Sequence, residues 1–176
     1  MILELLQRVS GSLEDHNIPY MVSGSIALNI YSIPRMTRDI DIVIELDMKK
    51  IDQFITLFPE SYLNESTIRD EVKRQGIFNI IDHKTGIKID FIVKKKSEYY
   101  DLAFKRKKRI KGTETDFWVI SIEDLIIAKL IWIQQLQSDT QIMDIENLLL
   151  YPEKDIEYIR KWIGKLELNT FNLPLK

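Results

Sequence analysis

The chain of 176 residues contains no cysteine. This absence excludes disulfide bonds and thiolate metal sites, and it fits the cytoplasmic location that we expect. The N-terminal stretch MILELLQRVS carries Glu4 within its apolar part and lacks a small-residue cleavage site, so we do not expect a secretory signal. Any metal site in the described sequence must therefore use oxygen or nitrogen ligands.

Long apolar runs and an excess of either charge are also missing. No apolar run reaches the roughly 18 residues that span a bilayer, so we expect no membrane partner. The formal net charge of −2 favours no class of partner by itself. The hydrophobic fraction of 45% suits a globular core. The length suits one domain, or one domain with a small helical appendage.

Apolar periodicity and turn residues indicate alternating helices and strands in the first two thirds of the chain. We expect helices over 2–16, 23–31, 48–58, 64–74 and 97–105, and strands over 20–22, 39–45, 77–81, 87–93, 109–110 and 116–120. Further helices follow over 121–136, 139–150 and 153–165. This order predicts an α/β (α+β) fold with a core over residues 1–120 and a helical part over 121–176 packed on it, unless both form a single domain.

Two carboxylates open the apolar stretch DIDIVI, which begins at Asp39. Side chains alternate along a strand, so Asp39 and Asp41 share one face, about 6–7 Å apart at Cα, while the isoleucines face the core. Unpaired carboxylates at this spacing repel, which raises a pKa or requires a cation, and Mg²⁺ prefers carboxylate oxygens. The simpler alternative is that Asp39 ends a turn and that Asp41 pairs with Arg35 or Arg38.

A third acid and a Gly-Ser pair favour the functional interpretation. Asp90 lies late in another apolar strand, and three carboxylates converge if the two strands are neighbours. Such a cluster suits two metal ions that clamp the oxygens of a phosphoryl transfer. Gly24 and Ser25 follow a short strand and begin a helix, where backbone N–H groups can receive a phosphate. Alone, this pair could be only an N-cap and a tight turn.

In this order, the motifs resemble those of the DNA polymerase β-like nucleotidyltransferase superfamily. GSIALNIYSIPRMTRDIDIVI (24–44), SIEDLIIAKL (121–130) and DIENLL (144–149) are similar to motifs of the bacterial group that contains the nucleotidyltransferase toxins of type IV toxin–antitoxin systems. Ser23 stands where many relatives have a first glycine. The resemblance implies the nucleotidyltransferase fold, a mixed β-sheet flanked by helices.

The resemblance also implies an enzyme and its site. Transfer of a nucleoside monophosphate from an NTP, such as ATP, to an acceptor hydroxyl would depend on Mg²⁺, with Mn²⁺ as an alternative. The implied catalytic and metal-binding residues are Asp39, Asp41 and Asp90. The implied nucleotide-binding residues are Gly24, Ser25, Arg38 and Lys129. Lys129 would reach the phosphates or the Asp144 carboxylate, although the pattern alone equally suits a lysine extending from a packed helix edge.

The acceptor and other partners stay open. Between Lys94 and Lys111, nine of eighteen residues are basic, a segment that we call the basic segment. It could hold an RNA backbone, or it could be only a solvated face. An RNA or tRNA acceptor and a cognate antitoxin would follow from a toxin-like role. The alternatives are a non-catalytic nucleotide- or RNA-binding module of the same fold and a nucleotidyltransferase that modifies a protein or a small molecule.

Overall fold

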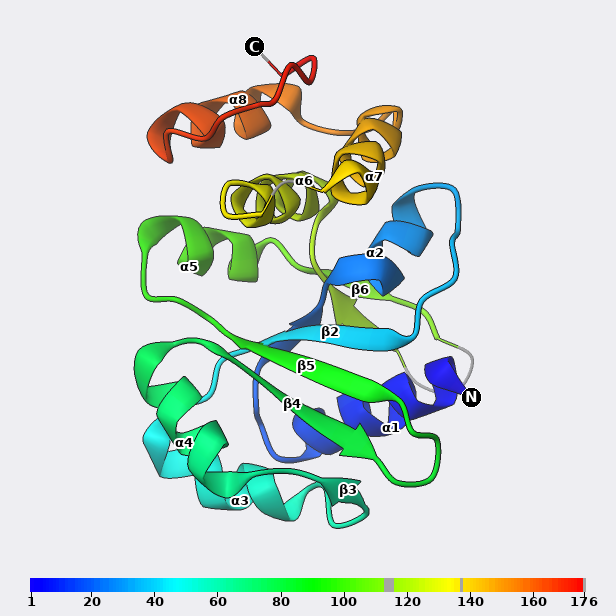
Figure 1. Ribbon diagram of the computed structural model, residues 1–176, viewed down its shortest axis with the longest axis vertical. Helices are drawn as coiled ribbons and strands as arrows, with labels where there is room; N and C mark the ends of the chain where they lie inside the picture. Colours follow the sequence, from blue (N-terminus) through cyan, green and yellow to red (C-terminus); the bar gives the residue numbers. More distant parts are fainter. Residues whose placement is uncertain (113–115, 137, 176) are drawn as a thin grey trace.

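The computed structural model describes residues 1–112, 116–136 and 138–175. Within these ranges, the centre of the molecule is a seven-stranded mixed sheet with the order β3-β4-β5-β2-β1-β7-β6 (Figure 1). Strand β2 pairs parallel with β5, and β1 pairs parallel with β7, whereas the other neighbours are antiparallel. The strands are β1 (Tyr20–Val22), β2 (Asp39–Ile44), β3 (Ser61–Tyr62), β4 (Ile77–Asp82), β5 (Lys88–Val93), β6 (Lys108–Ile110) and β7 (Phe117–Val119).

Helices cover the two sides of this sheet unequally (Figure 1). On one side lie α1 (Ile2–Asp15), α3 (Ile51–Thr56) and α4 (Glu65–Arg74). On the other lie α2 (Gly24–Tyr31), α5 (Glu98–Lys105), α6 (Ile122–Ile133), α7 (Asp139–Leu149) and α8 (Ile156–Lys165). The predicted α/β fold with a mixed sheet and C-terminal helices is therefore confirmed.

The core forms because each strand places alternate side chains against the helices. The isoleucines Ile40, Ile42 and Ile44 of β2 are fully buried, as the alternation of DIDIVI predicts. Phe91 of β5 lies in the same layer and packs edge-on against Phe54 of α3, with ring centroids 5.1 Å apart. Because the apolar residues of β2 are committed to this face, its two aspartates must point to the other.

Side-chain caps begin two of the predicted helices. The Asn64 side chain accepts a hydrogen bond from the backbone N–H of Thr67 at the start of α4. Ser121 Oγ accepts from the backbone N–H of Asp124 and donates to that carboxylate, which fixes the start of α6. Each cap satisfies a backbone donor that the first helical turn leaves unpaired.

Two elements differ from the sequence-based prediction. The expected helix over 48–58 begins with a 3₁₀ turn (Met48–Lys50), because the Asp47 side chain accepts from the backbone N–H groups of Lys49 and Lys50. Strand β3 was not predicted, since two residues are too short to show alternation. None of the described helices is both long and apolar enough to cross a bilayer.

Candidate active site

The register of β2 and β5 brings the predicted acids together. Asp41 lies directly opposite Asp90 in the parallel pair, and Asp39 lies opposite Lys88. Residues directly opposite one another in a sheet project from the same face, at about 4.8 Å spacing between strands. The condition that the sequence left open, that the Asp90 strand neighbours the Asp39 strand, is therefore met, and the three carboxylates share one face.

Helix α2 begins against this face, and its first residue has to be glycine. Gly24 has a φ of +57°, and a Cβ atom on it would overlap the Asp41 carboxylate. The backbone N–H of Ser23 donates to the Asp41 carbonyl oxygen at 2.8 Å, which holds the start of α2 on β2. Glycine at position 24 thus lets the N-terminus of α2 approach Asp41 more closely than a residue with a Cβ atom would permit.

The electrostatics at Asp41 combine burial with two neighbouring carboxylates. The pKa of Asp41 is raised from 3.8 to about 6, chiefly by burial and then by the neighbouring Asp39 and Asp90 carboxylates. The Ser25 backbone N–H, which donates to Asp41, and the Lys129 ammonium act in the opposite direction. The mutual repulsion that the sequence predicted is therefore present in the folded structure.

The ion pair that the simpler alternative predicts for Asp41 is absent among the described residues. Arg35 forms its ion pair with Asp144, not with Asp41. Within the described ranges, neither Asp39 nor Asp41 has an ion pair. Asp39 instead accepts a hydrogen bond from Thr37 Oγ1 at 2.9 Å.

The chemistry of this donor set fits a hard divalent cation. Carboxylate oxygens are the ligands that Mg²⁺ and Mn²⁺ favour. Burial contributes most to the raised pKa of Asp41, and a cation between the carboxylates would relieve the contribution of Asp39 and Asp90. The described residues contain no three acidic or histidine side chains already gathered as a ligand set. One of the three carboxylates already has a cationic partner, since Asp90 Oδ2 lies 2.6 Å from Lys88 Nζ. The sequence-based prediction missed Lys88, although its spacing from Asp90 places both on one face.

A buried ion-pair network joins the C-terminal helices to the start of α2. Arg35 donates to both oxygens of Asp144, at 3.1 and 3.0 Å, and its Nη2 also donates to Ser25 Oγ at 2.9 Å. Lys129 on α6 donates to Asp144 Oδ2 at 2.9 Å and to Gln141 Oε1 at 2.8 Å. Lys129 therefore contacts the Asp144 carboxylate, which is one of the two contacts expected for it.

Charge in this network is balanced by geometry. Burial alone would raise the pKa of Asp144, but the hydrogen bonds from Arg35 and Lys129 outweigh it and hold that pKa below its usual value. Burial lowers the pKa of Lys129 even though Asp144 favours the charged ammonium. Because two cations contact one carboxylate, we take all three groups as charged at neutral pH.

Arg38, the remaining predicted residue, is exposed in the segment before β2. Arg35 and Asp144 were not among the predicted site residues, although the sequence indicated Arg35 as a possible partner of Asp41 and Asp144 as a possible contact of Lys129. They are 109 positions apart, and their contact depends on how α7 packs on α2.

The sheet beyond the acids is open to solvent. Asn79 of β4 lies opposite Asp90, and Ile81 lies between Tyr62 and Lys88 in the next cross-strand row. Tyr62 is 60% exposed and Ile81 is 37% exposed, and Asn79 is exposed as well. The acids therefore lie at the boundary between the half of the sheet that α2 covers and a half with an apolar and amide surface.

Three of the nine basic residues of the basic segment form ion pairs within the protein. Lys94 pairs with Glu45 and Asp101, and Arg109 pairs with Glu14. Arg106 pairs with the buried carboxylates Glu123 and Asp124 and stacks on the Tyr158 ring at 4.0 Å. The exposed lysines that remain are Lys95, Lys96, Lys105, Lys108 and Lys111.

The segment also begins at the far end of the strands. Lys94 follows the last residue of β5 and pairs with Glu45, which follows the last residue of β2, whereas the acids lie nearer the first residues. Four residues of strand separate Asp90 from Lys94, which is about 13 Å.

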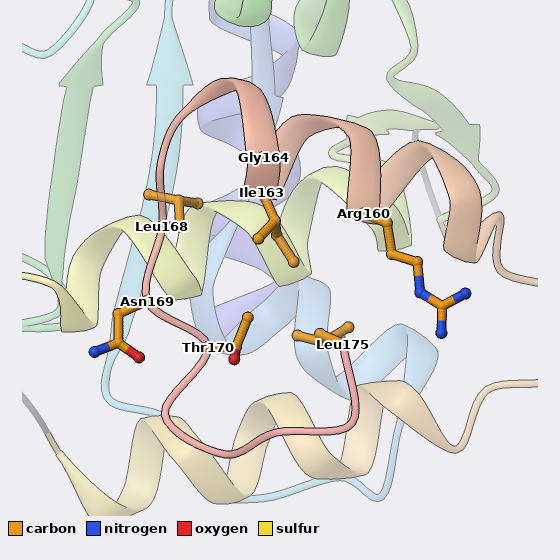
Figure 2. A pocket seen from close by; sticks show the side chains of 7 residues that line it. All are labelled: Arg160, Ile163, Gly164, Leu168, Asn169, Thr170 and Leu175. Atoms are coloured by element: carbon orange, nitrogen blue, oxygen red, sulfur yellow. The ribbon is translucent and has the colours of Figure 1, made fainter.

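A cavity of about 400 Å³ lies in the helical part, away from the acids. Figure 2 shows Ile163, Thr170 and Leu175 facing the space between α8 and the chain that follows it. Helix α6 lies between α8 and the sheet (Figure 1). None of the predicted site residues lines this cavity.

A mixed sheet with this acidic cluster and helix start is the architecture of a nucleotidyltransferase. The chain belongs to the family described as "Nucleotidyltransferase of unknown function (DUF6036)", which matches residues 1–172. A search of curated protein sequences found no match.

Solved structures share the fold at low sequence identity. ANT(2″)-Ia in complex with adenylyl-2″-tobramycin is 10% identical, with a TM-score of 0.61 over 94% of this chain and 98% of that chain. The solution structure of the antibiotic-resistance factor ANT(2″)-Ia is 11% identical, with a TM-score of 0.57 over 94% and 92%. An antigenic nucleotidyltransferase-like protein from Paracoccidioides brasiliensis is 20% identical, with a TM-score of 0.56 over 93% and 86%. Identities this low establish the fold and leave the substrate open.

Proposed function

We propose that this protein is a divalent-metal-dependent nucleotidyltransferase, which transfers a nucleoside monophosphate from an NTP to an acceptor hydroxyl. The observation that carries the proposal is the register of Asp41 opposite Asp90, with Asp39 beside them and the N-terminus of α2 against Asp41. Asp39, Asp41 and Asp90 would hold the metal. A divalent ion bound there would neutralise the carboxylates and stabilise the charge on the transferring phosphoryl group.

The chain itself supplies the phosphate contacts and their orientation. Because the Ser25 N–H already donates to Asp41, recognition of the triphosphate falls chiefly on Ser25 Oγ and on the cations behind it. Ser25 Oγ accepts a hydrogen bond from Arg35, which leaves its own O–H free to donate to a phosphate oxygen. Arg35 and Lys129 add positive charge at the N-terminus of α2, where the helix dipole already favours an anion.

The reaction then needs little covalent chemistry from the protein. The acceptor oxygen forms a bond to the α-phosphorus as the bond to the β-phosphate oxygen breaks, and pyrophosphate leaves in line. Asp90 orients the acceptor hydroxyl and takes its proton. Catalysis is positioning and charge stabilisation in a preorganised site.

The acceptor reaches Asp90 over the open half of the sheet, because α2 occupies the other side of Asp41. The nearest surface there combines Asn79 with the exposed Tyr62 and Ile81. ANT(2″)-Ia, which shares the fold, holds adenylyl-2″-tobramycin. A hydroxyl on a small molecule is therefore the first acceptor class to test.

The test measures NTP binding and transfer. With Mg²⁺ present, calorimetry should detect binding of at least one NTP, and α-labelled NTP should label an acceptor from small-molecule or RNA pools. Asp41→Ala should abolish metal-dependent NTP binding, while Asp70→Asn, an exposed acid on α4, should leave it unchanged. Metal-dependent binding that survives Asp41→Ala contradicts the assignment. Tight binding without transfer to any acceptor indicates a non-catalytic binding module instead.

A second candidate is RNA as the acceptor, with a toxin-like role and a cognate antitoxin. The exposed lysines of the basic segment favour it, and the resemblance of residues 24–44 and 121–130 to the toxin group supports it. Labelling of tRNA in total RNA, and growth arrest on expression that Asp41→Ala abolishes, would favour this candidate over a small-molecule acceptor.

A further inference from the structure

Lys88 is a cation built into the acidic cluster. Its Nζ lies 2.6 Å from Asp90 Oδ2, and its backbone position is directly opposite Asp39 on the neighbouring strand. Lys88 and Asp90 are two residues apart on β5, so their side chains share the face that carries all three acids. The ammonium therefore lies on the carboxylate that would receive a metal ion.

No other basic side chain in the described ranges pairs with these acids. Arg35 and Lys129 lie nearest among the remaining cations of the site, and both are committed to Asp144. Asp41 and Asp39 carry no ion pair among the described residues, so Lys88 is the cluster's one direct counter-charge there. Its side chain keeps 44% of its surface exposed, whereas that of Asp90 keeps 17%. A half-exposed lysine can leave such a contact without unpacking its surroundings.

We propose that Lys88 is a resident counter-ion that competes with divalent metal for Asp90, and that metal binding requires it to leave this carboxylate. The proposal rests on the proposed function only in taking Asp90 as a metal ligand. The ammonium occupies one lone-pair direction of Asp90 Oδ2 at 2.6 Å and offsets the negative charge of that carboxylate, so it competes with a metal ion for the same oxygen. An ammonium that stays beside a bound divalent ion also repels it, because both are positive. Lys88 therefore stabilises the metal-free cluster and lowers the affinity of the metal for it.

Calorimetric titration with Mn²⁺ alone, without nucleotide, tests this competition. Lys88→Met keeps the length of the aliphatic stem and removes the charge. We expect this variant to bind Mn²⁺ about tenfold more tightly than the wild type or better, which corresponds to about 1.4 kcal/mol. Lys88→Arg, which keeps the charge, should retain the weak binding. Lys84→Met is the matched control, since Lys84 is exposed in the turn just before β5. It should bind Mn²⁺ as the wild type does.

Thermal unfolding gives a second readout that does not depend on activity. Without metal, Lys88→Met should melt at a lower temperature than the wild type, because Asp90 loses its counter-charge. With saturating Mn²⁺, the rise in melting temperature should be larger in the variant. In an Asp90→Asn background, Lys88→Met should no longer increase Mn²⁺ affinity, since the carboxylate for which the two cations compete is gone.

Three results would overturn the proposal. They are unchanged Mn²⁺ affinity in Lys88→Met, weaker affinity in that variant, and failure of both wild type and variant to bind Mn²⁺. Unchanged affinity together with NTP transfer would remove only the role of Lys88. Tighter Mn²⁺ binding in the variant of a protein that transfers no nucleotide would support the role of Lys88 and contradict the proposed activity.

Discussion

Replacement of Gly24 by alanine tests the close contact on which the candidate site depends. Two costs add at this position. The φ of +57° places a non-glycine residue in the left-handed region, which costs about 1–2 kcal/mol. The new Cβ also overlaps the Asp41 carboxylate, and overpacking of this kind costs about 1–3 kcal/mol. We therefore expect Gly24→Ala to lower the free energy of unfolding by about 2–5 kcal/mol.

The chain offers a matched control for the backbone cost. Gly86 has a φ of +67°, but a Cβ atom on it would have no atom within 4 Å. Gly86→Ala should lose only the conformational part, about 1–2 kcal/mol, in urea unfolding monitored by circular dichroism. The difference between the two variants then measures the overlap with Asp41.

A double variant separates this overlap from other effects. Asp41→Ala removes the carboxylate but leaves a Cβ that is 2.8 Å from the new methyl group. In the Asp41→Ala background, Gly24→Ala should therefore lower the free energy of unfolding by most of the conformational cost that Gly86→Ala measures. It should add only part of the steric cost. If Gly24→Ala destabilises the wild type no more than Gly86→Ala does, the close approach of α2 to Asp41 is wrong.

Two further predictions concern the ion pairs and the acceptor. Asp144→Asn should lower the free energy of unfolding by about 3 kcal/mol between pH 5 and 8, since it leaves Lys129 buried beside a neutral partner. The pKa of Asp144 is below its usual value, so its stabilisation is present above the unfolded pKa and is lost as pH falls through the folded one. The difference between wild type and variant should shrink below about pH 4, and a difference independent of pH down to 3 would contradict this. If RNA is the acceptor, replacement of four exposed lysines by glutamine should weaken RNA binding and reduce the slope of log RNA affinity against log salt by up to about 3 units. The four are Lys95, Lys96, Lys105 and Lys108. An unaltered slope would contradict RNA contact by the basic segment.

The sequence predicted those features that depend on local patterns. Helix α1 and strand β2 follow from periodicity within single elements, and the spacing of Ser121 and Asp124 predicts the N-cap of α6. The shared face of Asp39 and Asp41 follows from alternation alone. What the pattern left open was whether the Asp90 strand is a neighbour, because pairing is decided by the whole sheet.

Contacts between residues far apart in the chain could not be predicted from the sequence pattern, because they depend on how the elements pack. The ion pair of Arg35 with Asp144 joins residues 109 positions apart through the packing of α7 on α2. The basic segment shows its charge in the sequence, but the carboxylates that neutralise it come from other elements, as Glu14 of α1 does for Arg109. A run of basic residues therefore predicts a nucleic-acid-binding surface only when the carboxylates that pair with it in the fold are known.

Two aspartates with different surroundings contrast a structural acid with a proposed metal ligand. Asp124 is fully buried, and Ser121, Tyr158 and Arg106 all donate to its carboxylate. Burial raises the pKa of Asp124, but all three donors act in the opposite direction, so the carboxylate has its partners within the fold and needs no ligand.

Asp41 has the opposite surroundings. Its surroundings include two further acids, Asp39 and Asp90, and burial together with these carboxylates raises its pKa from 3.8 to about 6. That shift corresponds to roughly 3 kcal/mol against the charged form. The core gains nothing from this cost, because the isoleucines on the other face of β2 bury equally well without the aspartates. The like charges at the start of an apolar strand are those that the proposed divalent cation would neutralise.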